Sequence, residues 1–241
     1  MRMRKSGMSR ARIRIAAAGA AACACLLLAG TAWAAQQPVI SADPGGINSY
    51  SMGTYTMDQG EFLQFQNTGP NNEHDVWSRA DGPDGKKLFI SPTIRPGNVT
   101  TVAGTQYLTA NPTGYPFFCN VHPFEMSGTL VVTGNGTPVP RPDIEVTVTS
   151  TKLDKVASKG KLLLRVQALT ASQNVSVEAK LGKIVLGRIP DLDLAAGQTR
   201  KATLKLNKSG KSKLAAKNKA TVKVTGNVAF GSPDTAKKKL S

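Results

Sequence analysis

Only two histidines occur in this chain of 241 residues, and they can share one site with a cysteine and a methionine. His122 lies three positions after Cys119 and four positions before Met126. The other histidine, His74, lies 45 positions before Cys119. These four side chains can act together only if the fold brings two distant loops to one end of the same domain. That requirement constrains the fold of this chain more than any single segment does.

The four side chains have the chemistry of one kind of metal site. Two neutral imidazoles and a thiolate form a trigonal set, and a thioether is soft and weak enough to bind at a long axial distance. This set holds a single copper ion in a type 1 site, which transfers electrons. The sequence therefore predicts one copper ion as cofactor, with His74, Cys119, His122 and Met126 as its ligands.

The histidine count excludes one class of copper protein. Multicopper oxidases and copper nitrite reductases need several further histidines for their catalytic metals. These 241 residues contain only the two histidines already assigned to the predicted site. We therefore predict no catalytic residue and no enzymatic activity. Simpler interpretations stay open for two of the ligands. Cys119 could be a buried inert thiol or form an intermolecular disulfide, and Met126 could be a core residue, with Met52 or Met57 as less favoured axial ligands.

The N-terminus has the three parts of a secretory signal peptide. A basic head without acidic residues precedes an apolar run at residues 16–29, and residues 32–34 read Ala-Trp-Ala, a typical cleavage site. The apolar run is too short to span a bilayer, although a retained membrane anchor stays an alternative. The residues before Cys23 match a lipoprotein site poorly, and no Arg-Arg pair indicates twin-arginine export. We expect residues 1–34 to be removed from an exported protein, which is extracellular, envelope-associated or periplasmic and keeps no transmembrane segment.

After this cleavage a single cysteine remains, so the mature chain has no disulfide framework and needs ordinary hydrophobic cores.

The distribution of charge divides this chain into two parts. Residues 35–140 carry 4 basic and 8 acidic side chains, a net of −4, whereas residues 141–241 carry 21 basic and 7 acidic side chains, a net of +14. A Pro/Gly-rich segment at residues 136–142 predicts a semi-rigid linker. We therefore predict two domains, at residues 35–135 and 143–241.

Both domains are predicted to be all-β. In the first, strand signals recur roughly every 8–12 residues between turn clusters, which favours an antiparallel sandwich or barrel, and no stretch has helical periodicity. Its predicted strands include residues 61–67, 76–77, 87–90, 99–102, 115–119 and 128–132. In the second domain, alternating segments predict a β-sandwich of immunoglobulin-like size. Its predicted strands are residues 143–149, 161–166, 175–179, 202–206 and 220–224, and residues 211–219 form a short helix or a crossing loop.

The first domain resembles the plastocyanin and amicyanin type of cupredoxins over residues 45–133. The shared features are a histidine-bearing loop after a Phe-x-Asn strand end, and a closing hairpin that reads Tyr-x-Phe-x-Cys-x-x-His-Pro before Met-x-Gly. This resemblance implies a Greek-key cupredoxin sandwich with a blue type 1 copper at one end, which shuttles between Cu(II) and Cu(I) and carries single electrons. It also implies that the apolar edge around His122 docks an unidentified redox protein. Phe124 could belong either to that surface or to the core.

Two features depart from the family pattern. The plastocyanin-type loop has four residues between its histidine and methionine and the amicyanin-type loop has two, whereas three separate His122 from Met126. The family commonly has asparagine after its first histidine, where this chain has Asp75, which can accept hydrogen bonds but cannot donate one when ionised. Because charges near a metal tune its potential, we expect the carboxylates of Glu73, Asp75 and Glu125 to lower the reduction potential.

The second domain has no cysteine, histidine or clustered pair of acidic residues, so we expect no active site there. Its lysines are concentrated between residues 201 and 223 and again at residues 237–239. Nucleic acid is disfavoured as a partner because the chain is exported and Phe230 is the domain's only aromatic residue. A solvated polar face, an anionic cell-envelope surface and an acidic redox partner stay open as interpretations.

The sequence thus favours an exported blue-copper protein that transfers single electrons. The alternative is a copper-binding module for delivery or sequestration, without an electron-transfer role. A structural domain that holds copper weakly or not at all is disfavoured, because all four ligand types are present. A rigid, strongly coloured site with a stable Cu(II) form would favour the carrier, and a labile Cu(I)-selective site would favour delivery.

Overall fold

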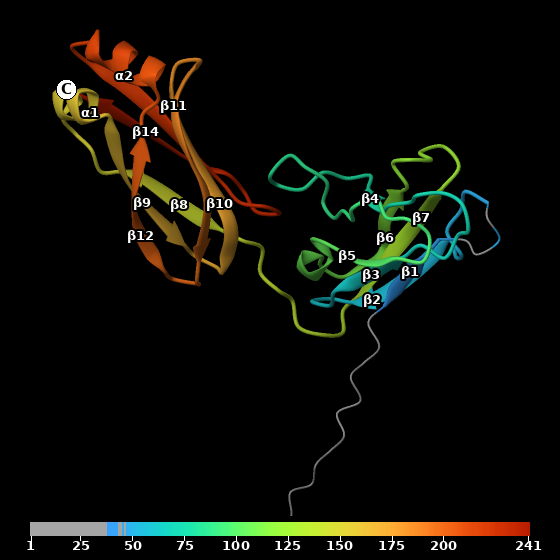
Figure 1. Cartoon of the computed structure of the whole chain (residues 1–241). Helices are drawn as coiled ribbons and strands as arrows, with labels where there is room; N and C mark the ends of the chain where they lie inside the picture. The colour runs from blue at the N-terminus through green and yellow to red at the C-terminus, as the bar shows by residue number, and fades with distance from the viewer. Residues whose placement is uncertain (1–37, 43–44, 46) are drawn as a thin grey trace, which may run out of the picture. The chain divides into compact units, whose positions relative to one another are not determined.

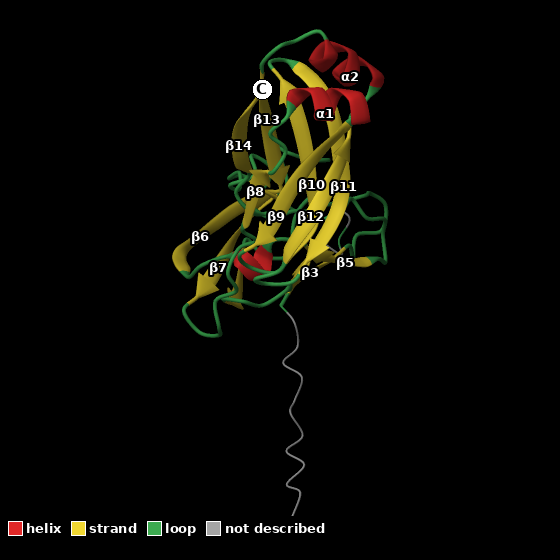
Figure 2. Ribbon diagram, turned by 90° about the vertical axis from the view of Figure 1, so that its left-hand side faces the viewer, coloured by secondary structure: helices red, strands yellow, loops and turns green. Residues whose placement is uncertain are grey.

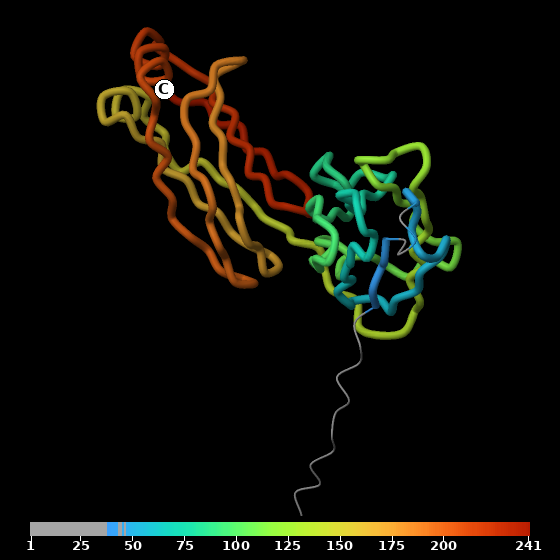
Figure 3. The backbone as a smooth tube through the Cα atoms, turned by 45° about the vertical axis from the view of Figure 1, so that its right-hand side comes forward, coloured from blue at the N-terminus to red at the C-terminus, as the bar shows by residue number. Residues whose placement is uncertain are grey.

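The computed structural model describes residues 38–42, 45 and 47–241 (Figure 1). The predicted signal peptide lies outside the described residues. Within them the chain is mostly β-strand, and its buried apolar residues form two separate clusters. One cluster runs from Ile40 to Val132 in the sequence, and the other from Ile144 to Leu240. Residues 137–143, between the two clusters, have neither helix nor strand (Figure 3).

Seven strands are described in the N-terminal part. They are β1 (Val39–Ser41), β2 (Thr54–Asp58), β3 (Leu63–Gln66), β4 (Trp77–Ser78), β5 (Val99–Val102), β6 (Asn111–Phe118) and β7 (Ser127–Thr133). One sheet has the strand order β1-β3-β5 and the other has the order β2-β7-β6-β4. β1 pairs parallel with β3 and β2 pairs parallel with β7, whereas the remaining pairs are antiparallel. The prediction of an all-β fold is confirmed here, but the sheets are mixed and not purely antiparallel.

The two sheets enclose a core rich in aromatic side chains. Side chains of β3 alternate between buried and half-buried, which places Leu63 and Phe65 inside. From the other sheet, Phe117 of β6 is completely buried, and its ring centroid lies 4.9 Å from that of Tyr50. Because Phe117 is two residues before Cys119, this packing fixes the end of the strand from which the predicted cysteine ligand extends.

The strand predicted at residues 87–90 does not form. Only isolated bridges occur there, between Asp81 and Lys87, Trp77 and Ile90, and Ile90 and Ala103. The Phe89 N–H donates to the side-chain oxygen of Ser78 at 3.2 Å, and Pro92, which has no N–H, follows shortly afterwards. The apolar pattern of this segment instead reflects burial, because Phe89 is completely buried in the core.

Seven further strands and two helices are described in the C-terminal part. The strands are β8 (Ile144–Val148), β9 (Lys161–Ala168), β10 (Ser172–Leu181), β11 (Ile184–Leu194), β12 (Thr199–Lys205), β13 (Ala220–Asn227) and β14 (Asp234–Leu240). The helices are α1 (Leu153–Lys159) and α2 (Lys208–Ala215), which lie next to each other at one end of the strands (Figure 2). None of the helices in the described residues is long and apolar enough to cross a membrane.

All pairs in the C-terminal part are antiparallel, in two sheets with the orders β12-β9-β8 and β11-β10-β13-β14. Each of the five predicted strands is present, because its apolar residues alternate and pack into one core. The sequence interpretation missed β11, β14 and α1. In β14 the three consecutive lysines hide the alternation, although Leu240 at its end is completely buried.

The helix alternative for residues 211–219 is correct only in part, because α2 begins at Lys208 and ends at Ala215. Asn207 caps α2, since its side-chain oxygen accepts the N–H of Gly210 at 2.6 Å. The other helix, α1, ends at Gly160, which has the left-handed conformation (φ 62°) common after helices.

We predict that Phe117→Ala destabilises the protein by about 3–5 kcal/mol, because it removes a completely buried ring and leaves a cavity. Phe124→Ala is the matched control. Its ring is 99% exposed, so we expect a change within about 0.5 kcal/mol. Chemical denaturation of both variants checks this. Equal midpoints for the two variants would contradict the placement of Phe117 in the core.

Candidate metal centre

His74 lies in a loop that is fastened to a neighbouring segment by paired backbone hydrogen bonds. Its N–H donates to the carbonyl of Ile94 at 3.1 Å, and the Ile94 N–H returns a bond to the His74 carbonyl at 2.9 Å. The Asn67 side chain donates to the carbonyls of both Ile94 and Asn72, at 2.9 Å and 2.8 Å. These bonds position the imidazole before any metal binds.

Cys119, His122 and Met126 lie on one loop between β6 and β7. The Cys119 N–H donates to the carbonyl of Met126 at 2.9 Å, which closes the loop at its base. Inside it, the His122 N–H donates to the Cys119 carbonyl at 3.2 Å and the Met126 N–H donates to the His122 carbonyl at 3.1 Å. The loop with three residues between histidine and methionine is therefore compact and internally hydrogen-bonded.

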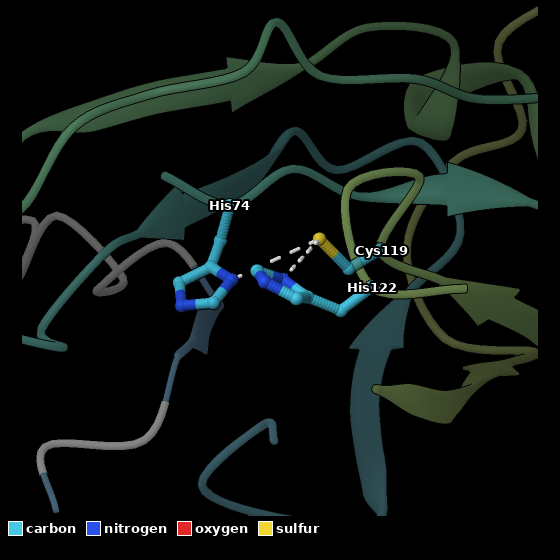
Figure 4. A group of neighbouring side chains, drawn as sticks. All are labelled: His74, Cys119 and His122. Carbon is cyan, nitrogen blue, oxygen red and sulfur yellow. Dashed lines mark hydrogen bonds between the residues drawn. The ribbon is translucent and has the colours of Figure 1, made fainter. Parts of the chain in front are cut away.

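The fold brings His74 to the same place as this loop. The Cys119 Sγ lies 3.8 Å from Nδ1 of His74 and 3.9 Å from Nδ1 of His122 (Figure 4). One ligand atom from each of the three side chains can be chosen so that all lie within 4.8 Å of one another. The two imidazole centroids are 4.9 Å apart. Both histidines thus direct the same ring nitrogen towards the sulfur.

These separations fit a shared metal ion. Metal–sulfur bonds of about 2.3 Å and metal–nitrogen bonds of about 2.0–2.1 Å, as in zinc sites, place two ligand atoms roughly 3.6–3.8 Å apart at tetrahedral or trigonal angles. The two observed sulfur–nitrogen distances, 3.8 Å and 3.9 Å, are close to the trigonal value. Two imidazole nitrogens and a thiolate in a plane are the donor set that Cu(II) and Cu(I) both accept.

The centre is mostly shielded from water. Cys119 is completely buried, His74 is 3% exposed and His122 is half-buried. Burial lowers the pKa of His74, and the nearby His122 lowers it further, while the charge of Asp75 raises it. A neutral imidazole is the form that binds metal, so this environment favours ligation at neutral pH.

The pKa of the Cys119 thiol is subject to opposing influences. Burial raises its pKa above the ordinary value, the backbone N–H groups of Asp75, His122 and Val121 lower it, and the charge of Asp75 raises it. The Asp75 N–H lies 3.5 Å from the sulfur. Without a metal the thiol is therefore protonated at neutral pH, and metal binding must release its proton.

Met126 is completely buried at the base of the same loop. The two methionines considered as substitutes are poorly placed. Met52 is 54% exposed, and Met57 of β2 pairs with Val132 of β7. Since a strand rises about 3.3 Å per residue, that pairing puts Met57 roughly 20 Å along the sheet from Met126.

Asp75 ties the two ligand loops together. Its carboxylate is completely buried and accepts two hydrogen bonds, from the Asn120 N–H at 2.6 Å and from the Thr93 hydroxyl at 2.8 Å. The Tyr50 hydroxyl donates to its backbone carbonyl at 2.6 Å. The prediction that aspartate accepts bonds in the position of the family's asparagine is confirmed. Thr93 and Tyr50 were not predicted, because nothing in their local sequence marks them.

The other two acidic residues are at the surface. Glu73 forms an exposed ion pair with Arg95, with an Nε–Oε1 distance of 3.1 Å, and Glu125 accepts a hydrogen bond from Asn48 at 3.0 Å. The charge of Arg95 offsets that of Glu73. Their effect on a reduction potential stays a prediction, and Asp75 is the carboxylate best placed to exert it.

The residues on either side of His122 in the chain are apolar and reach the surface. Phe124 is 99% exposed and Val121 is 45% exposed, while Pro123 is half-buried. The alternative in which Phe124 belongs to the core is therefore wrong. Its use as a docking surface stays a prediction.

No known protein-family model and no curated protein matches the sequence. Solved structures of amicyanin are similar to the chain. A mutant amicyanin in its reduced Cu(I) form at pH 4 is 21% identical with a TM-score of 0.32, covering 40% of this chain and 81% of that one. Amicyanin from Paracoccus versutus is 20% identical with a TM-score of 0.33, covering 41% of this chain and 82% of that one. Both matches cover about two fifths of this chain.

We predict that Asp75→Ala destabilises the protein by about 1–3 kcal/mol, because it removes both hydrogen bonds that the buried carboxylate accepts, from the Asn120 N–H and the Thr93 hydroxyl. Asp75→Asn is the conservative control. An amide can accept from Asn120 and donate to the Thr93 hydroxyl, so we expect it to retain most of the stability. Denaturant unfolding of the metal-free variants measures both. If Asp75→Ala were as stable as the unaltered chain, Asp75 would not be the tie between the loops.

Proposed function

We propose that this protein carries single electrons through one type 1 copper ion held by His74, Cys119 and His122, with Met126 as the axial ligand. The observation that supports this most is the approach of two imidazole Nδ1 atoms to one buried Cys119 Sγ, at 3.8 Å and 3.9 Å. A thiolate with two imidazoles, in a loop that also contains a buried methionine, suits copper better than zinc, which prefers closed tetrahedral sites without thioether ligands.

Copper would supply the one-electron step between Cu(II) and Cu(I). The protein's contribution is to keep the donor atoms in place, so that little has to move when the charge changes. The Cys119–Met126 backbone bond and the two bonds to the Asp75 carboxylate restrain the loops of both histidines. The core packing of Phe117 restrains the strand that leads into Cys119. These restraints favour fast electron exchange over metal release.

Copper delivery or sequestration is the alternative function. A delivery site needs a thiol that an incoming partner can reach, so that the metal passes from one ligand set to another. Cys119 is completely buried and His74 is 3% exposed, which disfavours such a transfer. His122 is the most accessible of the three. It supports a role as the exit point for electrons better than a role in metal transfer.

We also propose that the protein is exported. A redox protein would then dock on the apolar surface formed by Val121, Pro123 and Phe124. This surface is next to His122, so an electron would cross only a short distance there. The 99% exposure of Phe124 supports the proposal, because a large apolar ring left in water commonly marks a contact surface. Burial of this ring on association would contribute to the affinity.

We also propose that the C-terminal part is an immunoglobulin-like sandwich that acts as a spacer or adaptor. The strands β8 to β14 can be given the letters A, B, C, C′, E, F and G in chain order. The two sheets then have the strand orders A-B-E and C′-C-F-G. Immunoglobulin-type folds divide their strands in a closely similar way. Buried residues from all seven strands belong to one hydrophobic cluster, which supports a two-sheet core.

The first test is a visible spectrum of the mature protein after loading with Cu(II). We expect an intense thiolate-to-Cu(II) band that is bleached by ascorbate and absent in Cys119→Ser, because the band needs the thiolate. The histidine variants His74→Gln and His122→Gln should weaken or broaden it. A colourless protein, or one that takes up only Cu(I), would overturn the carrier function and favour delivery.

The same spectra test the axial ligand. Met126→Leu should keep the thiolate band but raise the reduction potential, because loss of the axial sulfur disfavours Cu(II). Met52→Leu is the matched control and should change neither property, since the Met52 side chain is 54% exposed to solvent, whereas Met126 is completely buried. An unchanged potential in Met126→Leu would make Met126 a core residue only.

A further inference from the structure

A pocket in the C-terminal part is lined by cations and hydroxyl groups. Its volume is about 500 Å³, and it lies between the segment after β8, helix α1 and the outer surface of β9 and β12. The residues around it are Thr149, Ser150, Thr151, Lys152, Lys155, Val156, Lys159, Lys161, Leu163 and Thr203. Four of them are lysines, four carry hydroxyls and none carries a carboxylate.

No carboxylate lines this pocket to offset its positive charge, although Lys152 and Lys155 also line a neighbouring pocket that contains Asp154. No ion pair found among the described residues involves any of the four lysines. In the same part of the chain Glu178 does pair with cations, with Lys180 at 2.5 Å and Arg188 at 2.6 Å. An external anion is therefore the partner that the pocket lacks.

The arrangement also places like charges next to each other. Lys155 and Lys159 are four residues apart on α1, so they share one helix face. Lys161 of β9 is directly opposite Lys205 of β12. Each of these pairs of neighbouring lysines destabilises a protein slightly when no counter-ion is present. Anion binding would remove that repulsion, which favours occupancy.

The lysines extend from a fixed scaffold. Leu153 and Val156 anchor α1 in the core, where each is 3% exposed. The Leu206 N–H donates to the carbonyl of Gly160 at 2.9 Å, which joins the end of the helix to the segment after β12. The pocket is therefore held open by the fold, and a ligand need order only the lysine side chains.

The lining selects the chemistry of the ligand. Ammonium groups and hydroxyls donate to phosphate oxygens, and Ser150 can still donate its proton because its oxygen accepts the Leu163 N–H at 2.9 Å. No aromatic side chain lines the pocket, so nothing is available to stack on a base. Its volume lies within the usual range of small-molecule sites, about 300–1,000 Å³.

We propose that this pocket binds a non-aromatic anion with more than one phosphate group, either free in solution or as part of a phospholipid headgroup. The site is independent of copper. It would give the basic C-terminal part a specific place of attachment to an anionic envelope.

The test uses the full mature chain at physiological ionic strength, with inorganic tripolyphosphate measured by calorimetry and vesicles containing cardiolipin, whose headgroup carries two phosphates, measured by flotation. The Lys155→Gln/Lys161→Gln variant should weaken binding of the effective probe at least about tenfold, as expected for lost charge-assisted hydrogen bonds. Lys223→Gln/Lys237→Gln is the matched control. It removes the same charge from a cross-strand pair of β13 and β14 outside this pocket, so affinity should change less than about twofold.

A second variant keeps the charge and fills the space. Thr203 is exposed on β12, and a β-strand tolerates an aromatic residue at such a position. Thr203→Tyr should therefore weaken binding as the lysine variant does. Cys119→Ser should bind as the unaltered chain does, which separates this site from the copper proposal. Site-specific loss with tripolyphosphate identifies a free phosphate ligand, and the same loss with vesicles alone identifies a headgroup. Equal weakening in both lysine variants, or no binding of either probe, would overturn the proposal.

Discussion

The buried carboxylate of Asp75 is the contact on which the N-terminal site depends. It accepts a hydrogen bond from the loop of Cys119, through the Asn120 N–H, and another from Thr93, close to the segment that pairs with His74. Its backbone N–H approaches the sulfur at 3.5 Å, and its carbonyl accepts the hydroxyl of Tyr50. One residue therefore joins the aromatic core, both ligand loops and the cysteine sulfur. Since it directly follows His74 in the chain, any displacement of its carboxylate would also displace the imidazole.

The grouping of His74, Cys119 and His122 could be predicted because their residue types are rare, and the structure brings these three side chains together. Two histidines, and one cysteine outside the predicted signal peptide, leave few combinations, and the short loop from Cys119 to Met126 keeps three of the predicted ligands close in sequence. The partners of Asp75 could not be predicted in the same way. Threonine and tyrosine are common, and the contacts of Thr93 and Tyr50 arise from tertiary packing across 18 and 25 residues of sequence.

Strands were predictable where alternation was clean and hidden where another constraint was stronger. The alternating segments of β8, β9 and β13 were found because each buries every second side chain. Lysines obscured the same alternation in β14, because Lys237 and Lys239 are exposed while Lys238 between them is half-buried, and only Leu240 is fully buried. Residues 87–90 show the converse, because Phe89 is buried in the core while the segment forms only isolated β-bridges. Burial sets the apolar pattern, and hydrogen bonding decides whether a strand results.

The charge asymmetry of the chain follows from the different requirements of its two parts. A site that keeps His74 and Cys119 neutral in the absence of metal needs few nearby cations, because the approach of a Cu ion would be opposed by them. Acidic groups such as Asp75 favour metal binding, which releases the Cys119 proton. The lysines of α1 and β9 have no such restriction, and their pocket contains no carboxylate. In both proposals the charge around the site suits its ligand, a metal cation at the N-terminal centre and an anion at the C-terminal pocket.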